Sequence, residues 1–256
     1  MVLPNAKHFQ RENTEQLSAS LAKPSSYKLL YWGMLGVAGA SRDMLEYAGA
    51  KWENLKPEGV WPQEKLDTPF HVLPVLSIKT EDGKDLTISE ANLVEQYLAK
   101  QFGLLGSNDY EEYLVKIFQS SSSAIQLNLA LTVTWTQPEV KEKSFQFFKE
   151  NSLATWIATH EKHLADNGNN GHYVSNKLTL ADIRTANVLD HWATLPEGKE
   201  IMEIVGKSEA LMKVYATVSK EPKLAAWRAS EKYRELTEAN KAFFVNPFAA
   251  IAAPKK

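Results

Sequence analysis

The stretch YKLLYWGMLGVAG at residues 27–39 is typical of a buried strand that runs into a flexible, glycine-rich loop. Apolar residues then recur at helical spacing, and Gly49 is a typical residue for the end of such a helix. The apolar positions are Met44, Leu45 and Ala48, and the polar residues expected on the opposite face are Arg42, Asp43 and Glu46. The sequence therefore predicts a strand followed by a short amphipathic helix.

A predicted β-hairpin and a second helix follow. Residues 72–78 read VLPVLSI and residues 86–88 read LTI, with a turn between them at 81–84. Helical spacing resumes at residues 93–98. Pro74 lies inside the first strand of this hairpin, where it would remove a ladder hydrogen bond. It is interpreted either as an edge-strand proline or as part of a cis Leu73–Pro74 bond beside a binding site.

The second half of the chain is predicted to be all-helical, because long helical periods replace the strand pattern after Gly106. Residues 179–182, TLAD, have the spacing of a capping box, in which Thr179 and Asp182 satisfy backbone amides at a helix start. The helix that follows is apolar nearly all round, which indicates that it is buried within the helical half.

Composition excludes several classes of protein. Of the 256 residues, 44% are hydrophobic and 23% charged, and the formal net charge of -2 provides no basic surface for nucleic acid or an anionic membrane. No apolar run approaches the roughly 18 residues of a membrane span, and the N-terminus turns polar too early for a secretory signal. We therefore expect a cytoplasmic protein that binds neither nucleic acid nor membrane. The chain has no cysteine, so any sulfur chemistry must come from a ligand.

Four segments are predicted from the changes in composition along the chain. Residues 1–26 are a polar N-terminal extension, because Pro24 and the serines after it end any helix that begins earlier. The α/β domain is expected at 27–105, the all-α domain at 106–240 and a C-terminal tail at 241–256.

These motifs together resemble the cytosolic glutathione S-transferase family, and its sigma-like class in particular, over about residues 27–235. That class has a first strand with a pattern like YKLxYF, where this chain has YKLLYW. Further matches are Trp61-Pro62 followed by Lys65, PFHVLPVL at 69–76, LTI at 86–88 and LTLADI at 178–183. The resemblance implies a thioredoxin-like α/β domain, then an all-α domain, in a homodimer that serves detoxification.

The resemblance also implies a role for each matching residue. The Tyr31 hydroxyl would donate a hydrogen bond to the sulfur of glutathione and thereby lower the pKa of the thiol. Taken alone, Tyr31 is more simply an aromatic side chain packed at a strand end. The glutathione-binding matches are Trp61, Lys65, Leu73, Pro74, Glu90 and Ala91. Trp61 and Lys65 would hold the glycine carboxylate, and the Leu73 backbone would pair with the cysteinyl part.

Three positions depart from the family pattern. The third helix of the domain usually begins with Glu or Gln followed by Ser, but here it reads Glu90-Ala91, so a hydroxyl is missing. Val37 replaces a usual arginine, and Val72 replaces a usual polar residue. We expect a weakened glutathione site, in which backbone amides at the helix start still bind a carboxylate.

The electrophile pocket of this family lies between its two domains. The matching residues are Met34, Leu35, Val37, Leu127, Leu131 and Trp135. Their apolar character suits a pocket, and it suits the core of each domain equally well. His160 and His163 have no carboxylate or thiolate spaced to complete a metal site, so no metal is expected.

The function implied by the resemblance is conjugation of glutathione to an apolar, electrophilic small molecule. Peroxide reduction by the sulfur of glutathione is a second reaction open to the same site. The alternative is a non-catalytic relative with a structural, storage or ligand-binding role, which Val37, Val72 and Ala91 favour and Tyr31 and Trp61 oppose. A scaffold that docks partners through its terminal segments is a third hypothesis.

Overall fold

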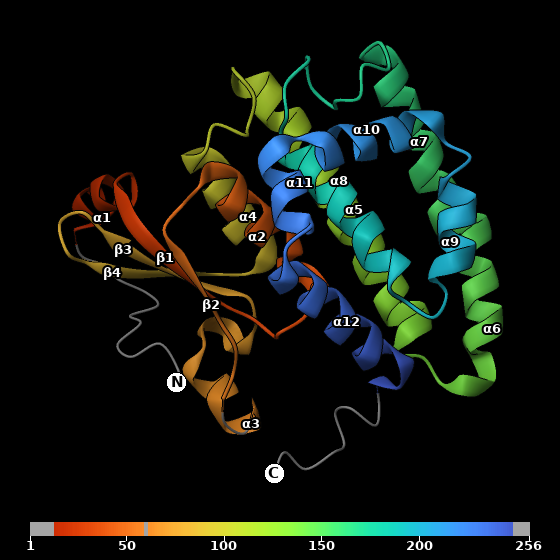
Figure 1. The fold of residues 1–256 in the computed structure, drawn as a ribbon, viewed down its shortest axis with the longest axis horizontal. Coiled ribbons are helices and arrows are strands. Elements are labelled where there is room, and N and C mark those ends of the chain that lie inside the picture. The colour runs from red at the N-terminus through yellow and green to blue at the C-terminus, as the bar shows by residue number, and fades with distance from the viewer. Residues whose placement is uncertain (1–12, 59–60, 248–256) are drawn as a thin grey trace. The chain divides into compact units, whose positions relative to one another are not determined.

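The computed structural model of the protein describes residues 13–58 and 61–247, without the side chains of residues 61–62. The chain forms two compact units, Met1–Phe102 and Gly103–Lys256 (Figure 1). The first unit is a small mixed sheet with helices, and the second is all-helical in its described residues. The predicted fold class, a thioredoxin-like α/β domain followed by an all-α domain, is confirmed.

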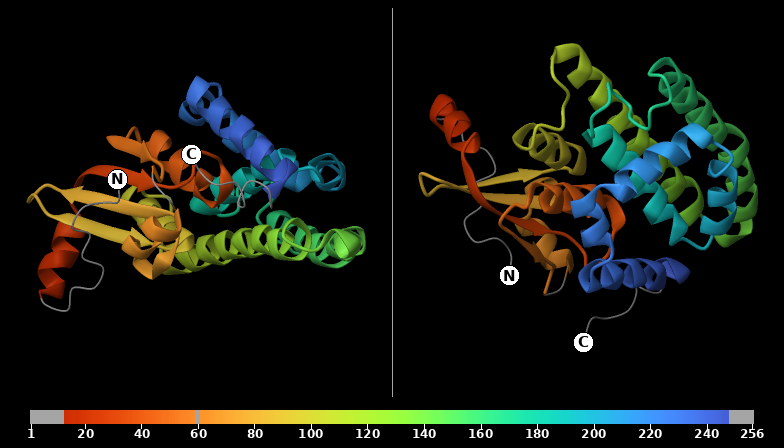
Figure 2. Two further views of the ribbon diagram at one scale, coloured as in Figure 1. Left: turned by 90° about the horizontal axis from the view of Figure 1, so that it is seen from below. Right: turned by 45° about the horizontal axis from the view of Figure 1, so that its top comes forward.

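The sheet of the first unit has four strands, which lie in the order β2–β1–β3–β4 (Figures 1 and 2). Their bounds are β1 Pro24–Leu30, β2 Trp52–Leu55, β3 Val75–Thr80 and β4 Asp85–Ser89. β1 pairs parallel with β2 and antiparallel with β3, and β3 pairs antiparallel with β4. Parallel pairing of β1 with β2 needs a crossover, which the first long helix of the unit supplies.

The helices of this unit are α1 Thr14–Leu21, α2 Gly39–Ala48, α3 Trp61–Glu64 and α4 Ala91–Gln101. Single 3₁₀ turns lie at Gly36–Ala38, Lys65–Asp67 and Pro69–His71. α2 contacts α4, which also contacts β3 and β4. The core between sheet and helices is apolar and fully buried, with Leu29, Leu76, Ile78, Met44, Leu45, Val94 and Leu98 as members. Burying such side chains drives the association of sheet and helices.

Two strand boundaries differ from the predicted ones. β1 begins at Pro24 instead of Tyr27, because residues 24–26 pair with the end of β3. β3 begins at Val75 instead of Val72, because Pro74 has no N–H to donate to a neighbouring strand. The Leu73–Pro74 peptide bond is cis.

Helix α1 forms within the segment that the sequence predicts to be a polar extension. It ends at Leu21, before Pro24, and lies beside the β3–β4 turn (Figure 2). Ser20 Oγ donates to Asp82 Oδ2 at 2.8 Å and accepts from Lys84 Nζ at 2.7 Å. The Leu21 carbonyl accepts from the Tyr97 hydroxyl at 2.9 Å. These partners lie more than 60 residues away in sequence, so no local pattern indicates them.

The second unit begins with α5 Asp109–Leu129, which continues into a π-helical segment, Ala130–Thr134. A second π-helical segment, Phe148–Leu153, joins α6 Pro138–Phe147 to α7 Ala154–Asp166. The remaining helices are α8 Leu180–Ala193, α9 Gly198–Val205, α10 Glu209–Lys220, α11 Pro222–Arg228 and α12 Glu231–Val245. α8 contacts α5, α9 and α10, and Figure 1 shows it running beside α5 through the middle of this unit.

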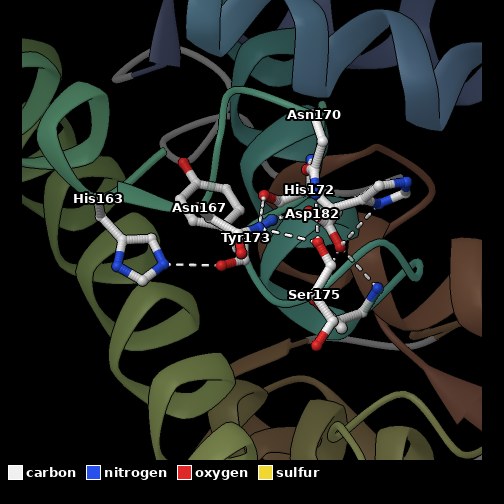
Figure 3. Close-up of polar contacts among 8 residues, drawn as sticks. His163, Asn167, Asn170, His172, Tyr173, Ser175 and Asp182 are labelled. Carbon is white, nitrogen blue, oxygen red and sulfur yellow. Dashed lines mark hydrogen bonds and ion pairs between the residues drawn. The ribbon is translucent and has the colours of Figure 1, made fainter. Parts of the chain in front are cut away.

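The capping box at the start of α8 is confirmed. Thr179 donates both its backbone N–H and its hydroxyl to Asp182 Oδ2, at 2.7 and 2.8 Å. The other carboxylate oxygen of Asp182 accepts the N–H of Tyr173 at 2.8 Å, so one buried side chain joins α8 to the preceding loop (Figure 3). Asn167 contributes from the end of α7, donating to the carbonyls of His172 and Ser175.

No helix in residues 13–58 and 61–247 is long and apolar enough to cross a lipid bilayer.

Candidate functional site

Tyr31 lies directly after the central strand β1, and two backbone contacts fix its position. Its N–H donates to the carbonyl of Leu55 in β2 at 3.0 Å. The Tyr31 hydroxyl accepts the backbone N–H of Val37 at 3.2 Å, so the loop closes over the ring. Gly36 makes this possible: its φ is +46°, and a Cβ there would lie 2.3 Å from Tyr31 Oη. Only glycine lets the loop approach the tyrosine so closely.

Arg42, from helix α2, hydrogen-bonds to the backbone of the loop that follows β1. Its guanidinium donates to the carbonyls of Trp32, Met34 and Leu35 at 2.9, 2.7 and 3.3 Å. Its Nε donates to Asn54 Oδ1 of β2 at 3.0 Å. The planar guanidinium of arginine spreads five donors over three nitrogens, so it can reach carbonyls that lie too far apart for the single nitrogen of a lysine. The loop after β1 is therefore fixed to both α2 and β2.

The prediction that Arg42 and Asp43 lie on the polar, exposed face of this helix is wrong. Arg42 is 1% exposed and Asp43 is fully buried. The helix turns Arg42 inward because the loop carbonyls require donors, and a buried carbonyl without a partner is unfavourable. Sequence reasoning missed this role of Arg42, and helical periodicity alone gives no signal for it.

Arg42 also supplies positive charge beside Tyr31. Its Cζ atom lies 5.6 Å from the centroid of the tyrosine ring. Burial lowers the pKa of Arg42 to about 10, and attraction to Tyr31 opposes that shift. The guanidinium therefore stays charged near neutral pH and favours negative charge on, or hydrogen-bonded to, the tyrosine oxygen.

The cis-proline loop follows a stretch of unusual backbone. Phe70 and His71 have φ values of 52° and 54°, and Leu73–Pro74 is cis. Leu73 is partly exposed and Pro74 is buried. Lys65, which is exposed, lies in the preceding turn, where its carbonyl accepts from the Thr68 hydroxyl at 2.8 Å.

Glu90 forms the whole connection between β4 and α4. β4 ends at Ser89 and α4 begins at Ala91, so Glu90 alone turns the chain, with φ 72° and ψ 118°. A residue other than glycine rarely adopts this conformation, and such strain is concentrated at functional sites. The Glu90 carbonyl accepts from the N–H groups of Leu93 and Val94, and its side chain is exposed and makes no capping hydrogen bond.

The remaining predicted site residues lie as follows. Trp61 is the first residue of α3, and its side chain lies outside the described part of the chain. In the first unit Leu35 is 1% exposed, whereas Met34 and Val37 are partly exposed. In the second unit, apolar side chains near the end of α5 are open to solvent: Leu127 is 57% and Leu131 is 61% exposed. Trp135 is partly exposed and meets Phe243 edge-on, with ring centroids 6.1 Å apart.

No group of three or more histidine, aspartate and glutamate side chains in residues 13–58 and 61–247 could hold a metal ion. His160 and His163, the two histidines considered as metal ligands, are hydrogen-bonded to Tyr173 within the second unit. His160 Nδ1 is hydrogen-bonded to the Tyr173 hydroxyl, and His163 Nε2 to the Tyr173 carbonyl at 2.7 Å (Figure 3 shows the latter).

Comparison with known proteins supports the resemblance to glutathione S-transferases. The family model described as "Glutathione S-transferase, C-terminal domain" matches residues 127–231. Glutathione S-transferase 1 of Ascaris suum is 31% identical over 208 residues, which cover 79% of this chain and 95% of that protein. S-crystallin SL11 of Nototodarus sloanii is 26% identical over 204 residues, covering 79% and 95%.

Among solved structures, the Fasciola hepatica sigma class glutathione S-transferase is similar with a TM-score of 0.68 at 25% identity, covering 81% of this chain and 98% of that one. The first unit, a mixed sheet with a cis-proline loop, has the thioredoxin-like fold, and an all-helical unit follows it in the chain. The chain belongs to the glutathione S-transferase family, and it is similar to this sigma class member. This family uses glutathione as a co-substrate.

Proposed function

We propose that the protein conjugates the thiolate of glutathione to an apolar, electrophilic small molecule, with the Tyr31 hydroxyl stabilising the thiolate. The observation that carries this proposal is the placement of that hydroxyl. It accepts a hydrogen bond from Val37 N–H at 3.2 Å, beneath Gly36, and its own hydrogen can be donated to a sulfur anion. The nearby charge of Arg42 favours an anion at the same place.

The reaction transfers a proton and then forms one carbon–sulfur bond. The thiol of glutathione loses its proton to solvent, and the Tyr31 hydrogen bond lowers the thiol pKa so that more thiolate exists at neutral pH. The sulfur lone pair then forms a bond to the electrophilic carbon, whose leaving group departs with its bonding electrons. The protein contributes no thiol, in keeping with a chain that has no cysteine.

Glutathione would be held by residues of the first unit. Lys65 and Trp61 pair with the glycine carboxylate, and the backbone of Leu73, before Pro74, pairs with the cysteinyl part. Glu90 and Ala91 receive the γ-glutamyl group at the start of α4, where backbone N–H groups favour a carboxylate. The strained backbone of Glu90 supports this placement. In the first unit, the electrophile would contact Met34 and Val37, which are partly exposed.

We expect weak glutathione binding. Val37, Val72 and Ala91 each lack a polar group that the family usually supplies. A hydrogen bond contributes about 0.5–1.5 kcal/mol, so three missing ones lower the affinity by roughly 10- to 1,000-fold.

The test is calorimetric titration with reduced glutathione, followed by conjugation to 1-chloro-2,4-dinitrobenzene. We expect binding in the micromolar to low-millimolar range. Tyr31→Phe should lower kcat/KM by roughly 10- to 100-fold, because a hydrogen bond to an anion contributes about 1.5–3 kcal/mol, and should leave thermal unfolding nearly unchanged. An unchanged kcat/KM in this variant would refute the role of Tyr31.

The second candidate function is non-catalytic, with a structural, storage or apolar-ligand role. It is favoured by the apolar Val37, Val72 and Ala91, and by similarity to a protein named S-crystallin. If calorimetric titration with glutathione, up to high millimolar concentration, released no heat of binding, this candidate would be favoured over the transferase.

We also propose a homodimer. Exposed apolar side chains support it in each unit: Leu66, Phe70 and Leu93 are 68%, 62% and 55% exposed in the first. Tyr110 and Tyr113 are 69% and 56% exposed in the second. The rings of Tyr110 and Tyr113 stack with centroids 6.2 Å apart, and clustered exposed apolar groups commonly mark an interface. Sedimentation velocity gives the mass in solution, and a purely monomeric protein at micromolar concentration would refute this proposal.

A further inference from the structure

The loop between α7 and α8 contains two Asn-Gly pairs, Asn167-Gly168 and Asn170-Gly171, which the proposed transferase reaction does not use. In such a pair the main-chain nitrogen of the glycine can attack the carboxamide carbon of the asparagine, because glycine has no Cβ to obstruct the approach. Asparagine is accordingly one of the chemically labile residue types in proteins. The folded loop holds the two pairs differently (Figure 3).

The two glycine nitrogens differ in their hydrogen bonds. The Gly168 N–H donates to the carbonyl of Ala165, near the end of α7, at 2.9 Å. The Gly171 N–H has no hydrogen-bond acceptor in residues 13–58 and 61–247. An amide nitrogen becomes a nucleophile once its proton is removed, and an N–H that donates to a carbonyl loses this proton less readily. Gly171 therefore supplies the more reactive nitrogen.

The two carboxamides also differ in their hydrogen bonds. Asn170 Oδ1 accepts the N–H of His172 at 2.9 Å, so this carboxamide curls back over the peptide group of Gly171. The same N–H would stabilise the negative charge that develops on Oδ1 when the glycine nitrogen attacks. Asn167 instead donates from Nδ2 to the carbonyls of His172 and Ser175, at 2.9 and 3.0 Å. These two bonds hold its carboxamide toward residues further along the loop.

Exposure and packing favour the second pair as well. The Asn170 side chain is exposed, whereas that of Asn167 is partly buried. Gly171 has φ +90°, and an added Cβ there would lie 2.5 Å from Thr217 Oγ1 of α10. The packing of the loop on α10 therefore requires glycine directly after Asn170. The more reactive Asn-Gly pair is in this way a requirement of the fold.

We propose that Asn170 deamidates spontaneously in the folded protein, and that the fold directs this reaction to Asn170 in preference to Asn167. The Gly171 nitrogen loses its proton to a base in water and forms a bond to Asn170 Cγ. Nδ2 takes up a proton and leaves as ammonia, which closes a succinimide ring. Water then opens the ring at either of its two carbonyls. The products are aspartate and isoaspartate at position 170, each with one more negative charge than asparagine.

Deamidation weakens the loop that leads into α8. Asn170 Nδ2 donates to the Ser175 carbonyl, and a carboxylate oxygen in its place cannot donate. In the isoaspartate product the main chain also runs through the former side chain. The residues that follow are His172 and Tyr173, and the Tyr173 N–H pairs with the buried Asp182 of α8. We expect the modified protein to melt about 2–4 °C lower.

The test compares the two pairs within one peptide. Trypsin cleaves after Lys162 and Lys177, so both pairs lie in the peptide of residues 163–177. The whole folded protein is incubated at physiological temperature, digested at intervals and sequenced by tandem mass spectrometry, with a zero-time sample to subtract deamidation during digestion. We expect Asn170 to deamidate at least about tenfold faster than Asn167. Its rate should rise with pH, because the glycine nitrogen must lose a proton.

Unfolding the protein in urea is the control for the effect of sequence alone. The two pairs should then react at similar rates, because the difference between them lies in contacts of the folded loop. Asn170→Gln is the matched variant, because glutamine must close a larger ring, and it should abolish reaction at this position without changing the rate at Asn167. Asn170→Asp should reproduce the lower melting temperature of the modified protein.

Three results would overturn the proposal. The first is a folded protein in which Asn167 reacts as fast as Asn170. The second is a folded protein that keeps Asn170 intact while the protein in urea loses it. The third is aspartate at position 170 without isoaspartate, which would show direct hydrolysis and no succinimide. All three are independent of glutathione binding and of the transferase proposal.

Discussion

Alanine in place of Gly36 is expected to disable Tyr31 far more than it destabilises the protein. An added Cβ would lie 2.3 Å from Tyr31 Oη and 2.7 and 2.9 Å from two carbons of its ring. Ordinary van der Waals contact begins near 3.4 Å, so the phenol must move by about 1 Å. Alanine at φ +46° is also strained, by about 1–2 kcal/mol.

The expected magnitudes separate the two effects. A displacement of about 1 Å in a catalytic group can lower a rate about 100-fold. We therefore expect kcat/KM for 1-chloro-2,4-dinitrobenzene to fall by roughly 10- to 100-fold in Gly36→Ala. Backbone strain of about 1–2 kcal/mol lowers the melting temperature of a protein of this size by about 2–8 °C.

Gly49→Ala is the matched control. Gly49 has φ +62°, in the same left-handed region, but nothing lies within 4 Å of its added Cβ. This variant should show a similar drop in melting temperature with unchanged kcat/KM. If both variants retained full activity, or both lost it equally, contact between Gly36 and the Tyr31 hydroxyl would not be what positions the catalytic group.

Three further predictions concern affinity, stability and pH. Ala91→Ser should tighten glutathione binding about twofold to tenfold in calorimetry by restoring one hydrogen bond, and no gain would show that the start of α4 does not contact glutathione. Arg42→Met should lower the free energy of unfolding by about 3–5 kcal/mol in urea, because buried carbonyls lose their donor. The exposed Arg234→Met should change it by less than about 0.5 kcal/mol, and equal effects would refute the role of Arg42. Burial lowers the pKa of both His160 and His191 to about 3, so both are neutral in the folded protein and become charged on unfolding below pH 6.5. The free energy of unfolding should therefore have its full value above about pH 7 and fall by a few kcal/mol as the pH is lowered from about 7 to about 5, and a flat profile over this range would contradict it.

The features of the fold that local sequence determines could be predicted. Alternating and helical hydrophobic patterns separated the α/β unit from the helical one, and the capping box at Thr179–Asp182 was evident from two residues three apart. The position of Gly49 at the end of α2 followed from its freedom to adopt a positive φ. Each of these depends on contacts within a few residues.

Features that depend on distant partners could not be predicted. The parallel pairing of strand β2 with β1 is one of them, because β2 is only four residues long and half polar, although a short strand at this place in the order was expected. Helical periodicity assigned Arg42 to solvent, since nothing local reveals that three loop carbonyls need its guanidinium. The strained backbone of Glu90 likewise follows from where β4 and α4 must join.

The candidate site was accessible to sequence reasoning only through resemblance. Tyr31, Trp61 and Lys65 are ordinary residue types in unremarkable positions, and their expected roles come from the pattern as a whole. That Val37 contributes its backbone N–H to Tyr31, while lacking the usual side chain, could not be inferred from residue type. Backbone contacts of this kind remain invisible until the loop conformation is known.

Helix α1 is attached to the sheet by polar groups and not by an apolar face. Ser20 is its only buried residue, and hydrogen bonds to Asp82, Lys84 and Tyr97 hold its C-terminal end. Water can replace such contacts with little net change in free energy. The helix can therefore detach and re-attach as a local unit while β1 keeps its partners. Amide hydrogens of residues 14–21 should exchange with solvent long before those of the strand that follows.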